Sequence, residues 1–393
     1  MATHHVKNRI AGRLEHVPPS GIRKYFDLII SMEGVISLGV GEPDFATPWH
    51  ITEAAIHTLE RGYTMYTSNS GMLELRQELA GYLKRTFGLE YDPNTELLIT
   101  NGVSEGLDLA MRAILDPGDE VIMSDPAYVA YPASVMLTDG VPVQVPTNCR
   151  NDFKLSAPDV ESRITGRTRA ILIGYPANPT GATMTMPELA QIADVARRHN
   201  LLVISDEIYN LLVYGTQPAC FACLPGMQER TILLGGFSKA YAMTGWRIGY
   251  AAGSAEIIAA MTKIHQYTAL CSPIMGQMAA VEALRSGEPE AMRMIEEYDR
   301  RRRVILKGLN DIGLDCFEPR GAFYVFPSIR CTGLSSEDFA ERLLMEEKVA
   351  VVHGTAFGPS GEGHVRCCYA TSMENIEEAL ARMARFVQRH RAH

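Results

Sequence analysis

Residues 231–249 read TILLGGFSKAYAMTGWRIG. The apolar run at 231–234 predicts a buried strand, so Ser238 and Lys239 are expected at the carboxyl end of that strand. Open α/β sheets bind their ligands at this edge. The stretch therefore predicts a ligand site built on the end of a central strand.

Three side chains of this stretch suit one kind of ligand. The amine of Lys239 can form an imine with an aldehyde, and Ser238 and Arg247 can hold a phosphate. A ligand that carries both groups is pyridoxal phosphate. From these residues alone a solvated Ser-Lys pair at a strand end is the alternative, so the interpretation needs support from the rest of the chain.

Strand-like runs alternate with helical stretches through the middle of the chain. They cover residues 120–123, 141–145, 168–173, 201–204, 231–234 and 248–251. This alternation predicts an α/β fold whose large domain holds a mainly parallel sheet covered by helices on both faces. Three of the strands run into polar turns, at 124–128, 174–181 and 205–209, which should share one edge of the sheet.

Three other segments have the composition of ligand-binding backbone. A strand at 96–100 leads into a helix near Ser104, whose free amides would bind an anion; the alternative is that Ser104 caps the helix. Gly41 lets backbone approach a ligand closely, although an ordinary turn fits equally well. The loop 63–71 carries Tyr66 and is too long for a tight turn, and such loops often carry function.

With 393 residues the chain exceeds the usual size of one domain. We expect residues 1–50 to form an N-terminal arm and part of a small domain. Residues 51–284 should form the large cofactor-binding domain. Residues 285–393 should form a smaller α+β domain that ends in an amphipathic helix at 374–387.

The charge balance argues against nucleic acid as a partner. The net charge is −9, so no overall basic field is present. The run Arg300–Arg303 follows acidic residues at helical spacing, which predicts a solvated, ion-paired helix face. No apolar run approaches the roughly 18 residues of a membrane span, and no secretory pattern opens the chain, so we expect a cytoplasmic protein with no membrane contact.

The cysteines predict free thiols. Eight cysteines over this length form no disulfide framework, and Cys220 and Cys223 make the only C-x-x-C spacing. No second ligand pair follows at zinc-binding spacing, so no metal site is expected. The role of this pair is left open by the sequence.

Five segments in order resemble the class I and II aminotransferases of pyridoxal-phosphate fold type I. They read LGVGEPDF, YPANPTG, SDEIY, FSKAYAMTGWRIGY and HVRCCYATS, and the likeness covers nearly the whole chain. Within that family the chain is most similar to prokaryotic and archaeal aspartate and aromatic aminotransferases. The resemblance implies a homodimer with shared active sites, since Tyr66 matches a tyrosine that reaches the phosphate of a neighbouring subunit.

The resemblance also implies a role for each site residue. Lys239 would form the imine and then move the proton, while Asp206 would keep the ring nitrogen protonated. Tyr209 and Asn178 would donate to the phenolic oxygen, and Tyr128 would stack on the ring, where the family often has Trp or Phe. The remaining contacts are Ser238, Arg247 and the amides of Val103 and Ser104 for the phosphate, and Arg366 with the Gly41 amide, Asn178 and Tyr128 for the substrate.

The expected reaction moves the amino group of an L-amino acid, aspartate or aromatic, to a 2-oxo acid, 2-oxoglutarate first among them, by a ping-pong cycle. Tyr128, the 321–324 turn, and Ile22 and Arg23 of the arm suggest a pocket with apolar walls and a charged edge. One alternative is a β-lyase or decarboxylase that uses the same cofactor. Another is a regulator with an aminotransferase-like sensor, disfavoured because only about 35 residues precede the strand that leads into the GEPDF segment. The physiological amino donor and the group that recognises its side chain stay open.

Overall fold

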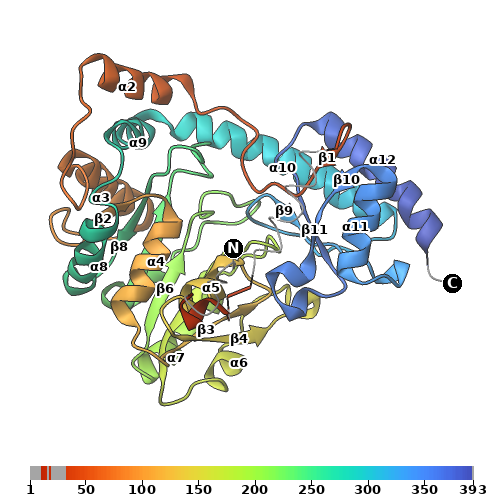
Figure 1. The fold of residues 1–393 in the computed structure, drawn as a ribbon, viewed down its shortest axis with the longest axis horizontal. Coiled ribbons are helices and arrows are strands. Elements are labelled where there is room, and N and C mark those ends of the chain that lie inside the picture. Colours follow the sequence, from red (N-terminus) through yellow and green to blue (C-terminus); the bar gives the residue numbers. More distant parts are fainter. Residues whose placement is uncertain (1–9, 16, 19–31, 392–393) are drawn as a thin grey trace, which may run out of the picture.

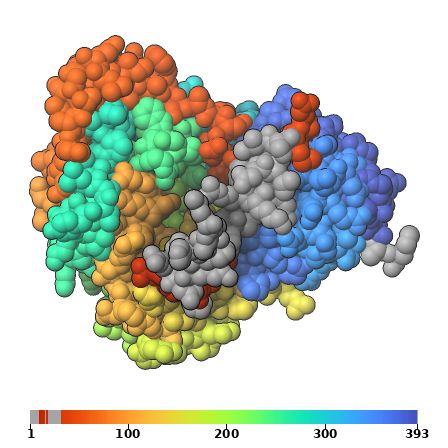
Figure 2. Space-filling view, in the orientation of Figure 1, coloured from red at the N-terminus to blue at the C-terminus, as the bar shows by residue number. Residues whose placement is uncertain are grey.

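The computed structural model describes residues 10–15, 17–18 and 32–391. Figure 1 shows a larger and a smaller body joined by the long helix α10 (Glu288–Asp311), and Figure 2 shows the smaller body in blue beside the larger one. The larger body contains helices α2 (Trp49–Glu60), α3 (Leu73–Phe87), α4 (Val103–Ile114), α5 (Ala130–Met136), α6 (Ala157–Glu161), α7 (Met186–Arg198), α8 (Ala255–Thr268) and α9 (Ile274–Ser286). Short 3-10 turns are η1 (Gly12–Glu15), η2 (Cys149–Asn151), η3 (Phe221–Cys223), η4 (Gln228–Arg230), η5 (Arg330–Thr332), η6 (Gly354–Phe357) and η7 (Pro359–Gly361).

The larger body is built on a seven-stranded sheet in the order β2-β8-β7-β6-β5-β3-β4. Its strands are β2 (Leu97–Thr100), β3 (Glu120–Asp125), β4 (Val141–Pro146), β5 (Thr168–Ile173), β6 (Leu202–Asp206), β7 (Thr231–Gly236) and β8 (Gly249–Ala252). Neighbours from β7 to β4 run parallel, whereas β8 is antiparallel to both β7 and β2. The predicted mainly parallel sheet is confirmed.

Helices cover both faces of this sheet. Successive side chains of a strand point to opposite faces. In β3, Ile122 packs in one hydrophobic cluster with residues of α6 and α7, while Val121 and Met123 pack in another with α4, α5 and α8. All three are fully buried, so the strands are apolar without alternation because neither face meets water.

The segment between β7 and β8 leaves the sheet at its carboxyl edge and returns. Ser238 and Lys239 follow directly after β7, as predicted, and Gly236 pairs with Gly249 where the chain comes back. A Cβ on Gly249 would lie only 2.6 Å from the carbonyl carbon of Gly102, so a side chain there would collide with backbone. The absence of a side chain lets β8 pack against the start of α4.

The smaller body carries two short sheets. Strands β9 (Tyr324–Val325), β11 (Val352–His353) and β12 (Val365–Cys368) form an antiparallel sheet in the order β11-β12-β9. Strand β1 (Ile36–Ser37) pairs in parallel with β10 (Val349–Ala350). Helices α11 (Ser336–Glu347) and α12 (Met373–His390) complete this body. In the described part of the chain, none of the helices combines the length and apolarity needed to cross a membrane.

The prediction of a solvated arginine face on α10 is wrong for two of its four residues. Arg301 and Arg302 are only 6% and 7% exposed. Arg301 binds Asp44 at 2.8 Å, and Arg302 binds Glu318 at 3.0 Å. The helix packs between the two bodies, so this side of it faces protein, and the buried guanidinium groups are paired as burial requires.

Candidate active site

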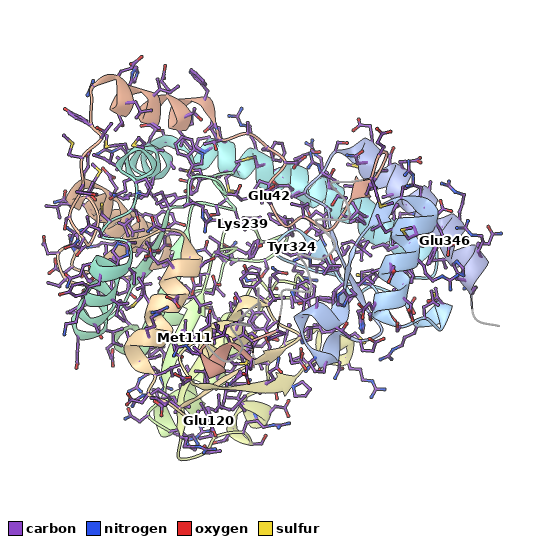
Figure 3. The ribbon with its side chains drawn as sticks, viewed as in Figure 1. Glu42, Met111, Glu120, Lys239, Tyr324 and Glu346 are labelled. Carbon is purple, nitrogen blue, oxygen red and sulfur yellow. The ribbon has the colours of Figure 1, made fainter. Side chains whose placement is uncertain are left out.

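A pocket of about 580 Å³ lies where the carboxyl edge of the seven-stranded sheet meets the smaller body. Figure 3 places Lys239 of the larger body near Glu42 and Tyr324 at this junction. The predicted site residues that line the pocket are Gly41, Val103, Ser104, Tyr128, Asn178, Asp206, Tyr209, Ser238, Lys239, Arg247 and Arg366. Tyr66 lies outside the pocket of its own chain and is 80% exposed. Ile22 and Arg23 fall outside the described residues.

Lys239 extends into the middle of the pocket. Its Nζ donates to the carbonyl oxygen of Gly41 at 2.6 Å and lies 5.8 Å and 5.7 Å from the ring centres of Tyr209 and Phe323. Burial among these groups lowers the pKa of Lys239 to about 8. A lysine with that pKa supplies a substantial fraction of neutral, nucleophilic amine near neutral pH.

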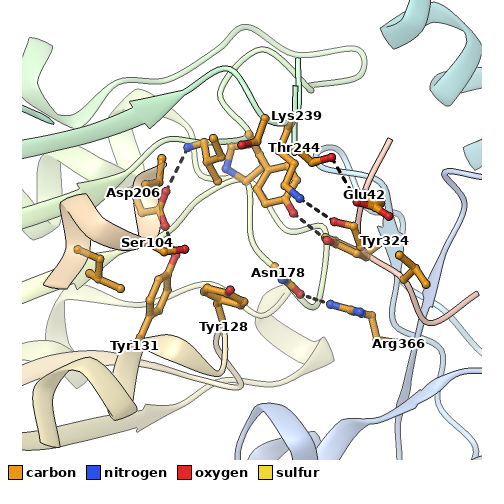
Figure 4. Close-up of a pocket in the computed structure, with 18 of the residues that line it drawn as sticks. Glu42, Ser104, Tyr128, Tyr131, Asn178, Asp206, Lys239, Thr244, Tyr324 and Arg366 are labelled. Carbon is orange, nitrogen blue, oxygen red and sulfur yellow. Dashed lines mark hydrogen bonds between the residues drawn. The ribbon is translucent and has the colours of Figure 1, made fainter. Parts of the chain in front are cut away.

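Asp206, the last residue of β6, lies at the floor of the pocket. Its Oδ1 accepts the Ile208 amide at 3.2 Å, and its Oδ2 accepts the Tyr131 hydroxyl at 2.9 Å (Figure 4). Burial raises the pKa of Asp206 to about 6, against the lowering effect of these hydrogen bonds. Sequence reasoning missed Tyr131, which lies in the first turn of α5 and is joined to Tyr128 by a bond from its amide to the Tyr128 carbonyl oxygen at 3.0 Å.

Tyr128 and Tyr131 form one aromatic corner of the pocket. Their rings meet edge to face with centres 5.6 Å apart. Tyr131 is buried and its hydroxyl binds Asp206, whereas Tyr128 is partly exposed in the pocket, so the ring of Tyr128 is the one available to a ligand.

Tyr209 is bonded to a second tyrosine that the sequence suggested only as an apolar wall. The hydroxyl groups of Tyr209 and Tyr324 are 2.7 Å apart (Figure 4). A Cβ on Gly41 would lie 2.4 Å from the Tyr324 hydroxyl oxygen. Glycine at position 41 therefore leaves room for the Tyr324 hydroxyl. The sequence predicted that the Gly41 backbone approaches a ligand closely; in the structure it closely approaches the side chain of Tyr324.

The start of α4 forms the anion-binding end of the pocket. The helix begins at Val103, and Gly102 stands in the cap position with a φ of 77° and no side-chain capping bond. The alternative that Ser104 caps the helix is wrong, because Ser104 lies inside the first turn. A Cβ on Gly102 would lie 2.6 Å from Nη2 of Arg247, so the guanidinium sits directly against uncapped helix amides.

A pair of side chains behind this turn, Glu105 and the buried His265, holds it in shape. Oε2 of Glu105 accepts the Asn101 amide at 2.5 Å, and its Oε1 lies 2.9 Å from Nδ1 of His265. His265 is fully buried. The pair fixes the backbone that leads into the helix amides.

Arg366 lies on β12 at the opposite end of the pocket and is 2% exposed. It donates to Oδ1 of Asn178 at 2.8 Å and to the carbonyl oxygen of Gly39 at 2.6 Å, between the rings of Tyr324 and Phe357. A guanidinium only donates hydrogen bonds, so the Asn178 amide oxygen must face it and the NH₂ group is left to donate elsewhere. The buried Nε of Arg366 has no partner.

Fold and site together define an α/β protein with a lysine, a carboxylate and two arginines around one pocket. The chain matches the family model "Aminotransferase class I and II" over residues 33–383. The aromatic-amino-acid aminotransferase 2 of Thermococcus litoralis is 45% identical over 384 residues, 96% of this chain and 98% of that protein. The aspartate aminotransferase of Pyrococcus abyssi is 46% identical over 96% of this chain and 98% of its own length.

A solved structure gives the same result. The aromatic aminotransferase of Pyrococcus horikoshii superposes with a TM-score of 0.89 at 44% identity, covering 94% of this chain and 99% of that one. The chain belongs to the class I and II aminotransferases. It is therefore a transaminase that depends on pyridoxal 5′-phosphate.

The residues of the pocket fit that cofactor. The uncapped amides beside Arg247 suit a phosphate, and the buried carboxylate of Asp206 suits a protonated ring nitrogen. Lys239 lies within electrostatic reach of both Asp206 and Arg247 and suits the aldehyde.

Proposed function

We propose that this aminotransferase accepts both aromatic and acidic L-amino acids as donors and 2-oxoglutarate as the acceptor, in a ping-pong cycle. The observation that carries the proposal is the distribution of charge in the pocket. Arg366 is buried with a free Nε at one end, and Arg247 lies at the anion-binding end. Among the described residues that line the pocket, no further arginine faces the substrate side chain.

This distribution favours dual use of substrates. A fixed, buried arginine for a side-chain carboxylate would be left unpaired when a phenyl ring entered, at about 3–5 kcal/mol. The pocket instead offers Val40, Ile208 and the Tyr128 ring as apolar surface. The names of the Pyrococcus relatives, one for aspartate and one for aromatic substrates, support both classes of donor.

We assign the proton transfers to two residues. When bound, the cofactor supplies an aldehyde and an electron-withdrawing ring. Nζ of Lys239 carries the proton to and from the substrate α-carbon, a task favoured by a pKa near 8. Asp206 holds the proton on the ring nitrogen, and its bond from Tyr131 keeps the carboxylate oriented.

The remaining side chains bind and orient. Arg366 grips the substrate α-carboxylate with its unpartnered Nε and one Nη group, a fork that suits a carboxylate, with the Gly41 amide assisting. The hydroxyl of Tyr209 and the NH₂ of Asn178 donate to the phenolic oxygen, and Tyr128 covers the ring. The phosphate is held by the side chains of Ser238 and Arg247 and by the amides of Val103 and Ser104.

We further propose that the enzyme is a homodimer in which Tyr66 completes the phosphate site of the second subunit. Tyr66 is 80% exposed. Three other large side chains are also exposed: Met65 (61%), Trp49 (66%) and Tyr267 (84%). Exposed aromatic and apolar side chains mark an interaction surface where they lie together in one patch, and Met65 and Tyr66 are adjacent. Replacing Tyr66 by Phe should weaken cofactor binding by one charged hydrogen bond, about 1.5–3 kcal/mol. A monomer that binds the cofactor as tightly as the dimer would contradict the shared site.

The domain division that we propose follows the sequence expectation. Residues 51–284 form the large domain, residues 285–393 the small one, and residues 1–50 an arm plus part of the small domain. The pairing of β1 with β10 supports the last assignment. The free state of all eight cysteines supports a reducing, cytoplasmic location.

Two assays test the proposed reaction. When the holoenzyme is mixed with an amino acid and no acceptor, a transaminase forms at most one equivalent of the matching 2-oxo acid per active site. A decarboxylase would instead release CO₂, and a β-lyase would release ammonia. Comparison of kcat/KM for phenylalanine, tyrosine, aspartate and glutamate then tests dual use. A preference for aspartate over phenylalanine beyond about 10⁴-fold, the level set by unpaired polar groups, would rule it out.

A further inference from the structure

The C-x-x-C pair lies in a single tight turn behind the cofactor pocket. The Cys223 amide donates to the Cys220 carbonyl oxygen at 3.2 Å, which closes the turn that begins η3. A turn of this kind brings the first and fourth Cα atoms within about 7 Å, and disulfides span about 4.4–6.8 Å. The Cys223 thiol donates to the carbonyl oxygen of Phe87 at 3.2 Å, and the Cys220 thiol lies close enough to Cys223 to affect its ionisation, so the turn places the two sulfurs near each other.

The two thiols differ in exposure and in acidity. Cys220 is 1% exposed, whereas Cys223 is half-buried and reaches the surface. The neighbouring Cys220 thiol lowers the pKa of Cys223, while the same interaction and burial raise the pKa of Cys220. Cys223 is thus the thiol suited to attack an oxidant, and Cys220 the thiol suited to resolve the product.

A buried carboxyl group connects the pair to the pocket floor. Oε1 of Glu207 accepts the Ser205 hydroxyl at 2.9 Å and the Phe221 amide at 3.1 Å, and the Cys220 thiol lies near the same carboxyl group. Oε2 of Glu207 is buried without a partner. Glu207 directly follows Asp206, so the thiol pair and the cofactor pocket share one strand end.

We propose that Cys220 and Cys223 form a reversible dithiol–disulfide site that is oxidised by hydroperoxides. The Cys223 thiol loses its proton to solvent, its thiolate attacks the outer peroxide oxygen, and the O–O bond breaks. The departing alkoxide or hydroxide takes a proton from solvent and leaves as an alcohol or water, giving a sulfenic acid on Cys223. The Cys220 sulfur then displaces the hydroxyl group as water, with its own proton transferred by way of Glu207. Two electrons pass from the two thiols to the peroxide, and a small dithiol reverses the change.

A metal is not the ligand that these groups suit. Within the described ranges, no cluster of three or more histidine, cysteine, aspartate or glutamate side chains is arranged to hold one. Two thiols in a tight turn beside one buried carboxyl favour the covalent change between the sulfurs.

The test is peptide mapping of the holoenzyme after brief exposure to hydrogen peroxide and alkylation of the remaining thiols. Trypsin releases residues 199–230, which contain Cys220 and Cys223 as their only cysteines, and residues 113–150, which contain only the exposed Cys149. We expect the first peptide to lose two hydrogens, about 2 Da, and to resist alkylation until dithiothreitol is added. The second peptide is the internal control for general oxidation.

Three outcomes would overturn the proposal. One is a 199–230 peptide that stays fully alkylatable at a peroxide dose that oxidises Cys149. The second is irreversible addition of oxygen to Cys223 without loss of the two hydrogens. The third concerns Cys220→Ser, which should leave Cys223 to accumulate sulfenic and sulfinic acid; an unoxidised Cys223 in that variant would remove its role as the attacking thiol.

Discussion

The bond between Tyr131 and Asp206 offers a perturbation whose size can be worked out. Tyr131→Phe removes one hydroxyl and keeps the ring, which packs so closely that a Cβ on Gly174 would lie 2.3 Å from that hydroxyl. The hydroxyl donates to the carboxylate at 2.9 Å. A hydrogen bond to a charged group contributes about 1.5–3 kcal/mol, and one pKa unit is about 1.4 kcal/mol, so the pKa of Asp206 should rise by about one to two units.

The sign of the effect on cofactor binding follows from that rise. With a pKa of about 6, Asp206 is ionised in roughly 90% of wild-type apoprotein molecules at pH 7. With a pKa one to two units higher, the ionised fraction falls to roughly 50–10%, and binding of a protonated ring nitrogen must first remove the proton. We therefore expect cofactor affinity about 2- to 10-fold weaker at pH 7 and nearly unchanged above pH 9.

Fluorescence titration of the apoprotein with cofactor at pH 7 and pH 9.5 measures this difference. Tyr175→Phe is the matched control, because Tyr175 is buried and bonded to the backbone of Phe153 and Leu155. Its loss should weaken folding without a pH-dependent change in affinity. A Tyr131→Phe affinity ratio that is equal at the two pH values would show that the hydroxyl acts through packing and would refute the electrostatic reasoning.

Three further predictions concern the rest of the pocket. Burial lowers the pKa of Lys239 to about 8, so the rate at which the apoprotein forms its covalent bond with the cofactor should rise about tenfold per pH unit below pH 8 and level off above it. Stopped-flow absorbance measures this rate. A rate that keeps rising to pH 10 would contradict the prediction. Arg366→Lys keeps the positive charge but cannot bind a carboxylate with two parallel hydrogen bonds, so KM for every amino acid should rise at least tenfold. An unchanged KM would exclude the contact between Arg366 and the substrate α-carboxylate. Glu105→Ala removes the acceptor of the Asn101 amide, so the affinity of the apoprotein should fall about tenfold for pyridoxal phosphate and stay unchanged for pyridoxal. An equal loss of affinity for both ligands would show that the substitution does not act through the turn before α4.

The central sheet could be predicted from sequence because its strands are short apolar runs. The predicted strand at 168–173 coincides with β5, and the turns after β3, β5 and β6 meet at one edge as parallel strands require. The antiparallel direction of β8 could not be read from its residues. Nor could the burial of Arg301 and Arg302, whose spacing to acidic neighbours also fits an exposed helix.

Most of the pocket lining was predictable because the motif residues follow strand ends. The contacts among those residues were not. The bond from Tyr131 to Asp206 joins residues 75 positions apart, and the one between Tyr209 and Tyr324 joins residues 115 apart. Such contacts depend on how the two bodies and their helices pack, and that packing cannot be predicted from local sequence composition.

The attachment of the cofactor to Lys239 is tested most directly by reducing the holoenzyme with borohydride and mapping its tryptic peptides. Reduction fixes the cofactor on the lysine that binds it and blocks cleavage there. The predicted result is one labelled peptide that spans residues 231–247 and is uncut after Lys239. Label on another lysine, such as Lys263, with a normally cleaved and unmodified Lys239, would contradict the assignment of the active site.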